Sequence, residues 1–212
     1  MELRIAALAR RDYLATWQAM REFTASRDDS TPDELWLVEH PPVYTLGRNG
    51  DPSHVLDAGG IPVVESDRGG QVTYHGPGQL LAYTLFDLNR LGIGVRSLVR
   101  GLENAVVATL AQYGIPCSAR LDAPGVYVDN RKIASLGLRI RHGRSYHGIS
   151  LNVDLDLAPF RAINPCGFPG LEVTSLAKLG VAVKPHEAAV PLIGQIMREF
   201  GYRRVQPVAG IL

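Results

Sequence analysis

Apolar side chains recur at the spacing of an α-helix in three stretches of the chain. The longest stretch covers residues 95–113, and the Gly-Ile-Pro sequence at 114–116 is typical of a helix end. Another covers residues 12–23 and begins at Asp12, a residue type that caps helices well. The third covers residues 186–200. The apolar stripes comprise Leu14, Trp17, Met20 and Phe23 in the first helix, Val95, Leu98, Val99, Leu102, Val106, Leu110 and Tyr113 in the second, and Val190, Ile193, Ile196, Met197 and Phe200 in the third.

Strands are indicated by short apolar runs and by alternation of apolar and polar side chains. Residues 125–128 and 132–140, joined by Asp129-Asn130, are typical of a hairpin, and residues 147–155 alternate again. Hairpins imply antiparallel pairing, and the helices do not follow a strict βαβ order. The pattern therefore predicts an α/β (α+β) fold, a single domain over residues 1–212 with a mixed, largely antiparallel sheet flanked by helices. The other expected strands are residues 35–40, 43–46, 61–65 and 79–88.

Composition narrows the classes of function. Hydrophobic residues make up 46% of the 212 residues, and the formal net charge of +1 gives no overall field that attracts nucleic acid or a membrane surface. No apolar run approaches the roughly 20 residues that span a bilayer. The N-terminus lacks the pattern of a secretory signal. We therefore expect a cytoplasmic protein with reduced cysteines and with no nucleic-acid or membrane partner.

The two cysteines differ in their surroundings. Cys117 follows Ile115 and is expected in the core, whereas Cys166 lies in an Asn-Pro-Cys-Gly turn. There Pro165 stiffens the chain, and Gly167 leaves room and a backbone N–H for a ligand. A thiol needs a basic or cationic partner to react at neutral pH, and an inert thiol is the competing interpretation. The histidines that composition allows as partners are His40, His54, His75, His142, His147 and His186.

Lysine is the alternative partner for the thiol, and it is rare in this chain. Only Lys132, Lys178 and Lys184 occur, and Lys132 precedes small and apolar residues at 133–137, an unusual place for a solvated lysine. A buried lysine whose pKa falls toward neutrality can take a thiol proton. The competing interpretation is a lysine at a hairpin edge whose side chain extends to water.

Glycine and polar residues concentrate in RGGQVTYHGPGQ, residues 68–79. Glycines allow a ligand to approach the backbone closely, and the polar side chains supply donors, so we interpret the segment as one wall of a pocket. A plain glycine-rich hairpin is the simpler interpretation. The segment matches neither a phosphate-binding loop nor a dinucleotide-binding motif. No Cys-x-x-Cys or His-Glu-x-x-His pattern predicts a metal site, and no Gly-x-Ser-x-Gly motif predicts a serine hydrolase.

Several segments resemble the octanoyltransferases of lipoate biosynthesis, also called lipoyl(octanoyl) transferases. The resemblance spans about residues 35–176, and its segments come in the family's order. It implies a fold shared with biotin protein ligases and lipoate protein ligases. The segments are EHPPVYTLGR at 39–48, RGGQVTYHGPGQLLAY at 68–83, KIASLGLRI at 132–140, HGISLN at 147–152 and INPCG at 163–167.

The same resemblance implies a reaction and a site. An octanoyl or lipoyl group passes from octanoyl-acyl carrier protein to an enzyme cysteine. It then passes to a lysine of a lipoyl domain, in 2-oxoacid dehydrogenase complexes or in the glycine cleavage H protein. No cofactor and no metal are implied. Cys166 matches the thioester residue, and Lys132 matches the lysine that activates the thiol and shuttles protons. The acyl-binding positions correspond to Arg68, Gly69, Gly70, Gln71, Val72, Thr73, Tyr74, His75, Ser135, Leu136, Gly137, Gly148, Ile149 and Ser150.

Two other functions compete with this one. An ATP-dependent lipoate or biotin protein ligase would share the fold, but it has no use for a nucleophilic cysteine in an Asn-Pro-Cys-Gly turn. A non-catalytic module that binds acyl carriers would keep an apolar pocket without the Cys166–Lys132 pair. Basic residues also gather in one place, which is either a solvated hairpin tip or a docking site for an acidic carrier protein. These residues are Arg139, Arg141, His142 and Arg144.

Overall fold

The computed structural model describes residues 1–120 and 122–208, and its largest element is an eight-stranded sheet. The strands are β1 (Glu2–Arg10), β2 (Asp33–Glu39), β6 (Gln79–Leu85), β7 (Ser118–Ala119), β8 (Gly125–Val128), β9 (Arg131–Arg141), β10 (Arg144–Asn152) and β11 (Arg204–Pro207). Their order in the sheet is β11-β1-β2-β6-β10-β9-β8-β7. β1 pairs in parallel with β2 and β11, and the other neighbours are antiparallel. The predicted mixed, largely antiparallel sheet is confirmed.

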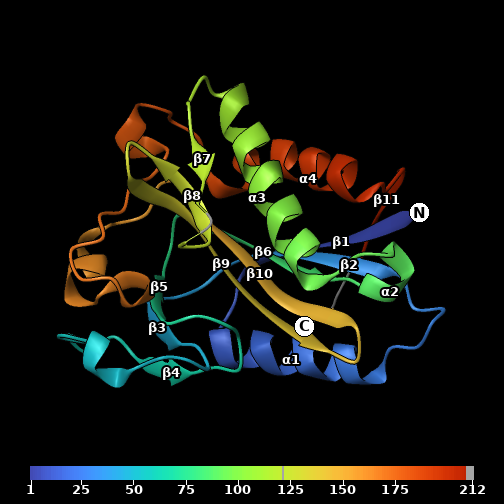
Figure 1. Ribbon diagram of the computed structural model, residues 1–212, viewed down its shortest axis with the longest axis horizontal. Coiled ribbons are helices and arrows are strands. Elements are labelled where there is room, and N and C mark those ends of the chain that lie inside the picture. The colour runs from blue at the N-terminus through green and yellow to red at the C-terminus, as the bar shows by residue number, and fades with distance from the viewer. Residues whose placement is uncertain (121, 209–212) are drawn as a thin grey trace.

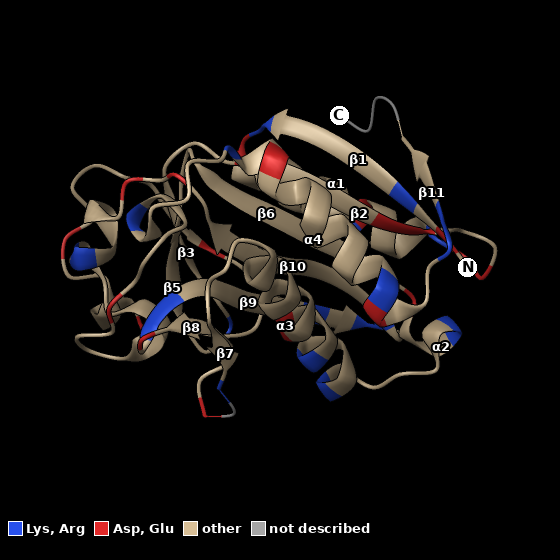
Figure 2. Ribbon diagram, turned by 90° about the horizontal axis from the view of Figure 1, so that it is seen from above, with Lys and Arg blue, Asp and Glu red and all other residues tan. Residues whose placement is uncertain are grey.

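Helices cover both faces of this sheet (Figure 1). α1 (Tyr13–Ser26) lies on one face, while α3 (Val95–Gln112) and α4 (Pro185–Phe200) lie side by side on the other (Figure 2). The short helix α2 (Leu88–Leu91) follows β6. Because both faces are covered, neighbouring residues of β2 enter two different cores. Leu35 and Leu37 pack in the core that includes α3 and α4, and Trp36 packs in the core beside α1.

A smaller sheet lies beyond one end of the large one (Figure 1). It consists of β3 (Val43–Leu46), β4 (Val63–Glu65) and β5 (Val72–His75) in the order β4-β3-β5, with β3 and β5 antiparallel. A third apolar cluster packs between this sheet and residues 155–163. Short 3₁₀ segments lie at Pro52–His54, Ala158–Ala162, Pro165–Gly167 and Ala177–Leu179. The strand β5 lies within the glycine-dense stretch, which we interpreted as a pocket wall, with a glycine-rich hairpin as the alternative.

Three residues that the sequence placed on apolar stripes are exposed: Leu14 (51%), Val95 (47%) and Val190 (69%). In α1 the buried residue next to Leu14 is Tyr13. In α4 Leu192 is buried, about 200° around the helix axis from Val190. Val95 is the first residue of α3. The expected helices are therefore confirmed. Met20 of α1 and Ile196 and Phe200 of α4 are buried as expected, whereas Leu14 and Val190 lie outside the buried faces.

The edges of the large sheet depart most from the expectation. β1 and β11 were not predicted, and the expected strand at 79–88 ends at Leu85, because Asp87 accepts from the N–H of Arg90 and caps α2. Cys117 is partly buried against the main core, as expected. Within the described residues, no helix has both the length and the apolar character needed to cross a membrane.

Candidate active site

Cys166 occupies a strained position in a tight turn. Its φ of 57° and ψ of 19° are left-handed, a conformation that costs a residue with a Cβ roughly 1–2 kcal/mol. Two hydrogen bonds hold the turn: Gly167 N–H donates to the Asn164 carbonyl (2.9 Å) and Phe168 N–H to the Pro165 carbonyl (3.1 Å). The N–H of Gly167 is thus used within the turn, contrary to our expectation that it would be free for an oxyanion.

Lys132 meets Cys166 across 34 residues of sequence. Its Nζ lies 2.9 Å from the Cys166 Sγ, donates to the Pro124 carbonyl (3.0 Å), and sits 5.3 Å from the ring centroid of Tyr127. Lys132 is 2% exposed, so its side chain does not extend to water. Its backbone bonds in strand fashion to the segment after the cysteine, through the Glu172 carbonyl (2.9 Å). That pairing explains how two distant residues come together.

The Lys132–Cys166 contact determines the protonation state of the lysine. Burial favours the neutral amine, but the charge of the Cys166 thiolate and the hydrogen bond to it outweigh burial and raise the pKa of Lys132. This differs from our expectation of a lysine whose pKa falls toward neutrality. The raised pKa instead keeps Lys132 a charged ammonium, with its Nζ 2.9 Å from the Cys166 Sγ.

A cavity of about 360 Å³ opens beside the pair, within the size range of small-ligand sites. All of the expected acyl-binding residues except Tyr74 line it, as do Cys166 and Lys132. Tyr74 instead packs against Tyr44 and Phe160 in the third apolar cluster. The lining residues that were expected are Arg68, Gly69, Gly70, Gln71, Val72, Thr73, His75, Ser135, Leu136, Gly137, Gly148, Ile149 and Ser150.

Several residues that line the cavity were not among the expected acyl-binding positions. Val95 and Val99 lie one turn apart at the start of α3, and Phe168 follows the cysteine turn, 47% exposed. The stripe of α3 was assigned to the core, although its first turn faces the cavity. The others are Tyr13, Leu81, Tyr83, Asp122, Ala123, Pro124, Leu138 and His147.

Arg68 braces the glycine-rich wall of the cavity. Its guanidinium donates to the Thr45 hydroxyl (2.8 Å) and to the Gln71 and Gly69 carbonyls (2.8 and 2.9 Å). These acceptors are neutral, and burial lowers the pKa of Arg68. The absence of a side chain at Gly137 makes room for it, since a Cβ there would lie 2.9 Å from the Arg68 Cδ. Arg68 therefore shapes the pocket as well as lining it.

None of the six histidines hydrogen-bonds to Cys166 within the described residues. His40 donates through Nδ1 to the Arg11 carbonyl (2.7 Å) and accepts from the Tyr83 hydroxyl at Nε2 (2.7 Å). Burial lowers its pKa to about 4. His75 pairs with the Gln79 amide oxygen (2.7 Å), and burial lowers its pKa to about 3. These histidines are neutral supports of the site, and lysine is the partner of the thiol.

The basic residues 139–144 at the β9–β10 hairpin are only partly available to a partner. Arg144 pairs with Asp87 (3.2 Å) and with Asp29 (3.2 Å), so its charge is already compensated. Arg141 and His142 are exposed at the hairpin tip. No group of three or more His, Cys, Asp or Glu residues in the described parts of the chain is arranged to hold a metal ion.

Comparison with known proteins identifies the family of the chain. The model of the lipoyl protein ligase A/B catalytic domain matches residues 12–196. An octanoyltransferase of Methylococcus capsulatus is 59% identical over 201 residues, which cover 95% of this chain and 97% of that protein. An octanoyltransferase of Alkalilimnicola ehrlichii is 62% identical over 186 residues, which cover 88% of this chain and 86% of that protein.

A solved structure shows the same fold at low identity. A putative lipoate protein ligase of T. acidophilum with bound lipoic acid superposes with a TM-score of 0.80 and 19% identity, covering 100% of this chain and 91% of that one. The expected ligase-like fold is thereby confirmed. The family model and the matches at 59% and 62% identity together show to which family the chain belongs. The chain belongs to the lipoyl protein ligase A/B catalytic domain family, and within it to the octanoyltransferases.

Proposed function

We propose that this acyltransferase carries an octanoyl group as a thioester on Cys166, on its way from octanoyl-acyl carrier protein to a lysine of a lipoyl domain. The observation that carries the proposal is the 2.9 Å contact between the Lys132 Nζ and the Cys166 Sγ at the cavity. We place the reaction in the cytoplasm, where a catalytic thiol stays reduced. The acceptors we propose are lipoyl domains of 2-oxoacid dehydrogenase complexes and the glycine cleavage H protein.

The first step forms the acyl-enzyme. The Cys166 thiolate attacks the thioester carbonyl of the donor, and a new C–S bond forms as the carbonyl oxygen takes the negative charge. When this intermediate collapses, the C–S bond to the carrier breaks, and the carrier sulfur takes a proton from the Lys132 ammonium. One thioester replaces another, so the step needs no ATP.

The second step uses the lysine in its other protonation state. Once Cys166 is acylated, no thiolate remains to raise the pKa of Lys132, and burial then favours the neutral amine. The acceptor amine attacks the thioester carbonyl and forms a C–N bond. Lys132 takes a proton from that nitrogen as the Cys166 thiolate leaves, which restores the ammonium–thiolate pair. Conversion of a thioester to an amide is downhill and drives transfer.

The cavity suits an unbranched acyl chain. Val95, Val99, Leu136 and Ile149 supply apolar surface along it, and each CH₂ that they remove from water contributes roughly 0.8 kcal/mol. We propose the expected acyl-binding residues, apart from Tyr74, as the groups that hold the chain. The relatives named octanoyltransferases support this choice of acyl group.

Intact mass spectrometry tests the proposal directly. Incubation with octanoyl-acyl carrier protein, without ATP, should add one octanoyl mass, and peptide mapping should locate it on Cys166. Cys166→Ala should show no adduct and no transfer to a lipoyl domain. An adduct that persists in this variant would refute the thioester mechanism. Loading of free octanoate that requires ATP would favour the ligase alternative instead.

A further inference from the structure

Glu103 is a buried carboxyl group on α3 that the transfer steps do not use. It is 7% exposed, and its Oε1 accepts a hydrogen bond from the backbone N–H of Gly125 (2.8 Å). Burial raises the pKa of Glu103, while that hydrogen bond and the nearby charge of Lys132 act in the opposite direction. A carboxyl group in such a place needs an explanation, because burial of an ionisable side chain is costly.

The segment that Glu103 holds is in direct contact with the catalytic lysine. The Pro124 carbonyl accepts from the Lys132 Nζ at 3.0 Å. Gly125 has a φ of 141°, and a Cβ placed on it would lie 2.7 Å from the Lys132 Cε. The lysine side chain therefore lies against this stretch of backbone, and the position of the backbone decides where the Nζ points.

A second anchor acts from the other side of the same segment. The Tyr127 hydroxyl donates to the Ala123 carbonyl (2.8 Å), and its ring faces the Lys132 Nζ. Ala123 and Pro124 also line the cavity. The short stretch 123–125 is thus both a wall of the pocket and a hydrogen-bonding partner of the lysine, and Glu103 is its tie to α3.

We propose that Glu103 is a positioning residue for the Lys132–Cys166 pair. By holding the Gly125 N–H it fixes the Pro124 carbonyl, which in turn directs the Lys132 Nζ to the sulfur. This inference rests on the proposed function for its consequence in acyl transfer, but the arrangement of the pair is testable without substrate. Misplacement of a catalytic group by about 1 Å can reduce a rate on the order of 100-fold.

Three variants of Glu103 separate the hydrogen bond from the charge and from folding. Glu103→Gln keeps an acceptor and loses the charge, Glu103→Asp keeps the charge but withdraws the acceptor, and Glu103→Ala loses both. Asn104→Ala is the matched control, because Asn104 lies next in the same helix and bonds instead to Glu199 of α4 (3.0 Å). Thermal unfolding shows which variants are folded at the assay temperature.

Two rates are then measured for each folded variant. The first is the rate of octanoyl transfer. The second is the rate at which iodoacetamide alkylates Cys166 at pH 7, measured by mass spectrometry. The alkylation needs no acyl substrate. Glu103→Asp and Glu103→Ala should lower both rates by about 10- to 100-fold. Glu103→Gln and Asn104→Ala should stay within about threefold of the unmodified protein, since a neutral amide oxygen still accepts from Gly125.

The outcomes distinguish the inference from the function on which it rests. Wild-type rates in Glu103→Asp and Glu103→Ala would overturn the positioning role. A loss in Glu103→Gln equal to that in Glu103→Ala would also overturn it, since charge would then be the property that matters. If the unmodified protein failed to transfer octanoyl groups but the alkylation differences were found, the proposed function would fall and the positioning of the pair would stand.

Discussion

Ionisable side chains around the cavity have pKa values set by what each one contacts. Burial lowers the pKa of Lys132, but the adjacent charge of Cys166 and the hydrogen bond to its Sγ outweigh burial and raise it. His40 is buried without an anionic partner in contact, and its pKa falls to about 4. Asp67 accepts from His147 (2.9 Å), Trp17 (2.8 Å) and the Tyr146 hydroxyl, which together outweigh burial and lower its pKa to about 2.

The buried histidines should make stability depend on pH. His40 has a pKa of about 4 when folded and an ordinary value near 6.5 when unfolded, so the unfolded chain binds the proton more readily. Its contribution is fully present above pH 6.5 and is lost as the pH falls toward 4, by about 3 kcal/mol. Urea denaturation at several pH values between 7 and 4 measures this slope. His40→Gln should have a shallower slope, and an unchanged slope would contradict the prediction.

At the scale of elements, α3 and α4 approach each other closely because a glycine lies between them. A Cβ on Gly101 of α3 would lie 2.7 Å from the ring of Phe200, which also packs edge-on against Phe86 (5.6 Å between centroids). Gly194 of α4, by contrast, has open space where its Cβ would be. Both glycines lie in helix interiors, but only Gly101 has close neighbours. Substitutions at the two positions therefore distinguish the effect of packing from the effect of helix propensity.

Alanine at these two positions should have opposite effects. Gly101→Ala should lower the free energy of unfolding by about 1–3 kcal/mol, because the Phe200 ring must move within a packed core. Gly194→Ala should raise it by up to about 1 kcal/mol through helix propensity. Denaturant titration of both variants measures the difference. Equal stabilisation by both substitutions would show that the helix contact accepts a methyl group.

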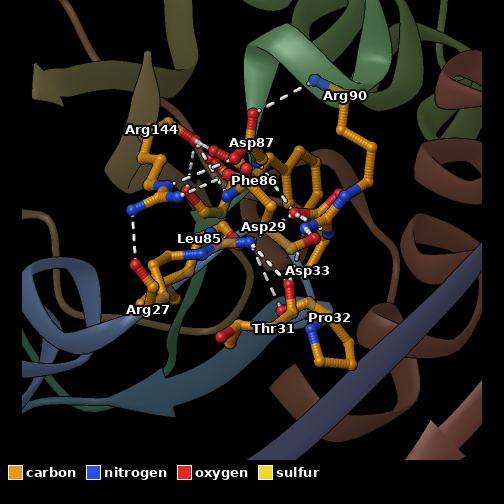
Figure 3. A network of polar contacts seen from close by, with 12 residues as sticks. Arg27, Asp29, Thr31, Pro32, Asp33, Leu85, Phe86, Asp87, Arg90 and Arg144 are labelled. Atoms are coloured by element: carbon orange, nitrogen blue, oxygen red, sulfur yellow. Dashed lines mark hydrogen bonds and ion pairs between the residues drawn. The ribbon is translucent and has the colours of Figure 1, made fainter. Parts of the chain in front are cut away.

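At the scale of the whole molecule, Asp33 joins segments from distant parts of the chain (Figure 3). Its carboxylate accepts from Arg27 at the end of α1 (2.7 Å), from Arg90 of α2 (3.3 Å) and from the Tyr202 hydroxyl near the C-terminal end (2.8 Å). It also accepts from the backbone N–H of Asp87 (2.7 Å). The Arg27 and Asp33 side chains are almost fully buried, so each charge depends on the other.

Breaking this network should cost far more than breaking a surface pair beside it. Asp33→Ala leaves the Arg27 charge buried without its partner and should lower the free energy of unfolding by about 3–5 kcal/mol. Asp29→Ala, which removes the fully exposed partner of Arg144, should change the free energy of unfolding little. Chemical denaturation compares the two. Similar losses in both variants would mean that burial does not govern the strength of these pairs.

What could be predicted from the sequence was mostly local. The turn chemistry around Cys166, the alternation of residues 147–155 and the periodicity of residues 95–113 indicate the elements, and ordered motifs indicate the family. The unpredicted strands β1 and β11 are held at the edge of the sheet by parallel pairing between the two ends of the chain. Such pairing leaves no local pattern, because its hydrogen-bond partners are distant in sequence.

The thiol in the Asn-Pro-Cys-Gly turn and the rare lysine were thus candidates by sequence alone. Tertiary structure decided that they touch, that Tyr74 faces away from the cavity, and that the Gly167 N–H is already bonded. It also decided the direction in which the pKa of Lys132 shifts. The sequence pattern predicts burial, and burial favours a neutral amine. The pKa of the lysine also depends on its distance from a neighbouring charge, and only the folded chain sets that distance.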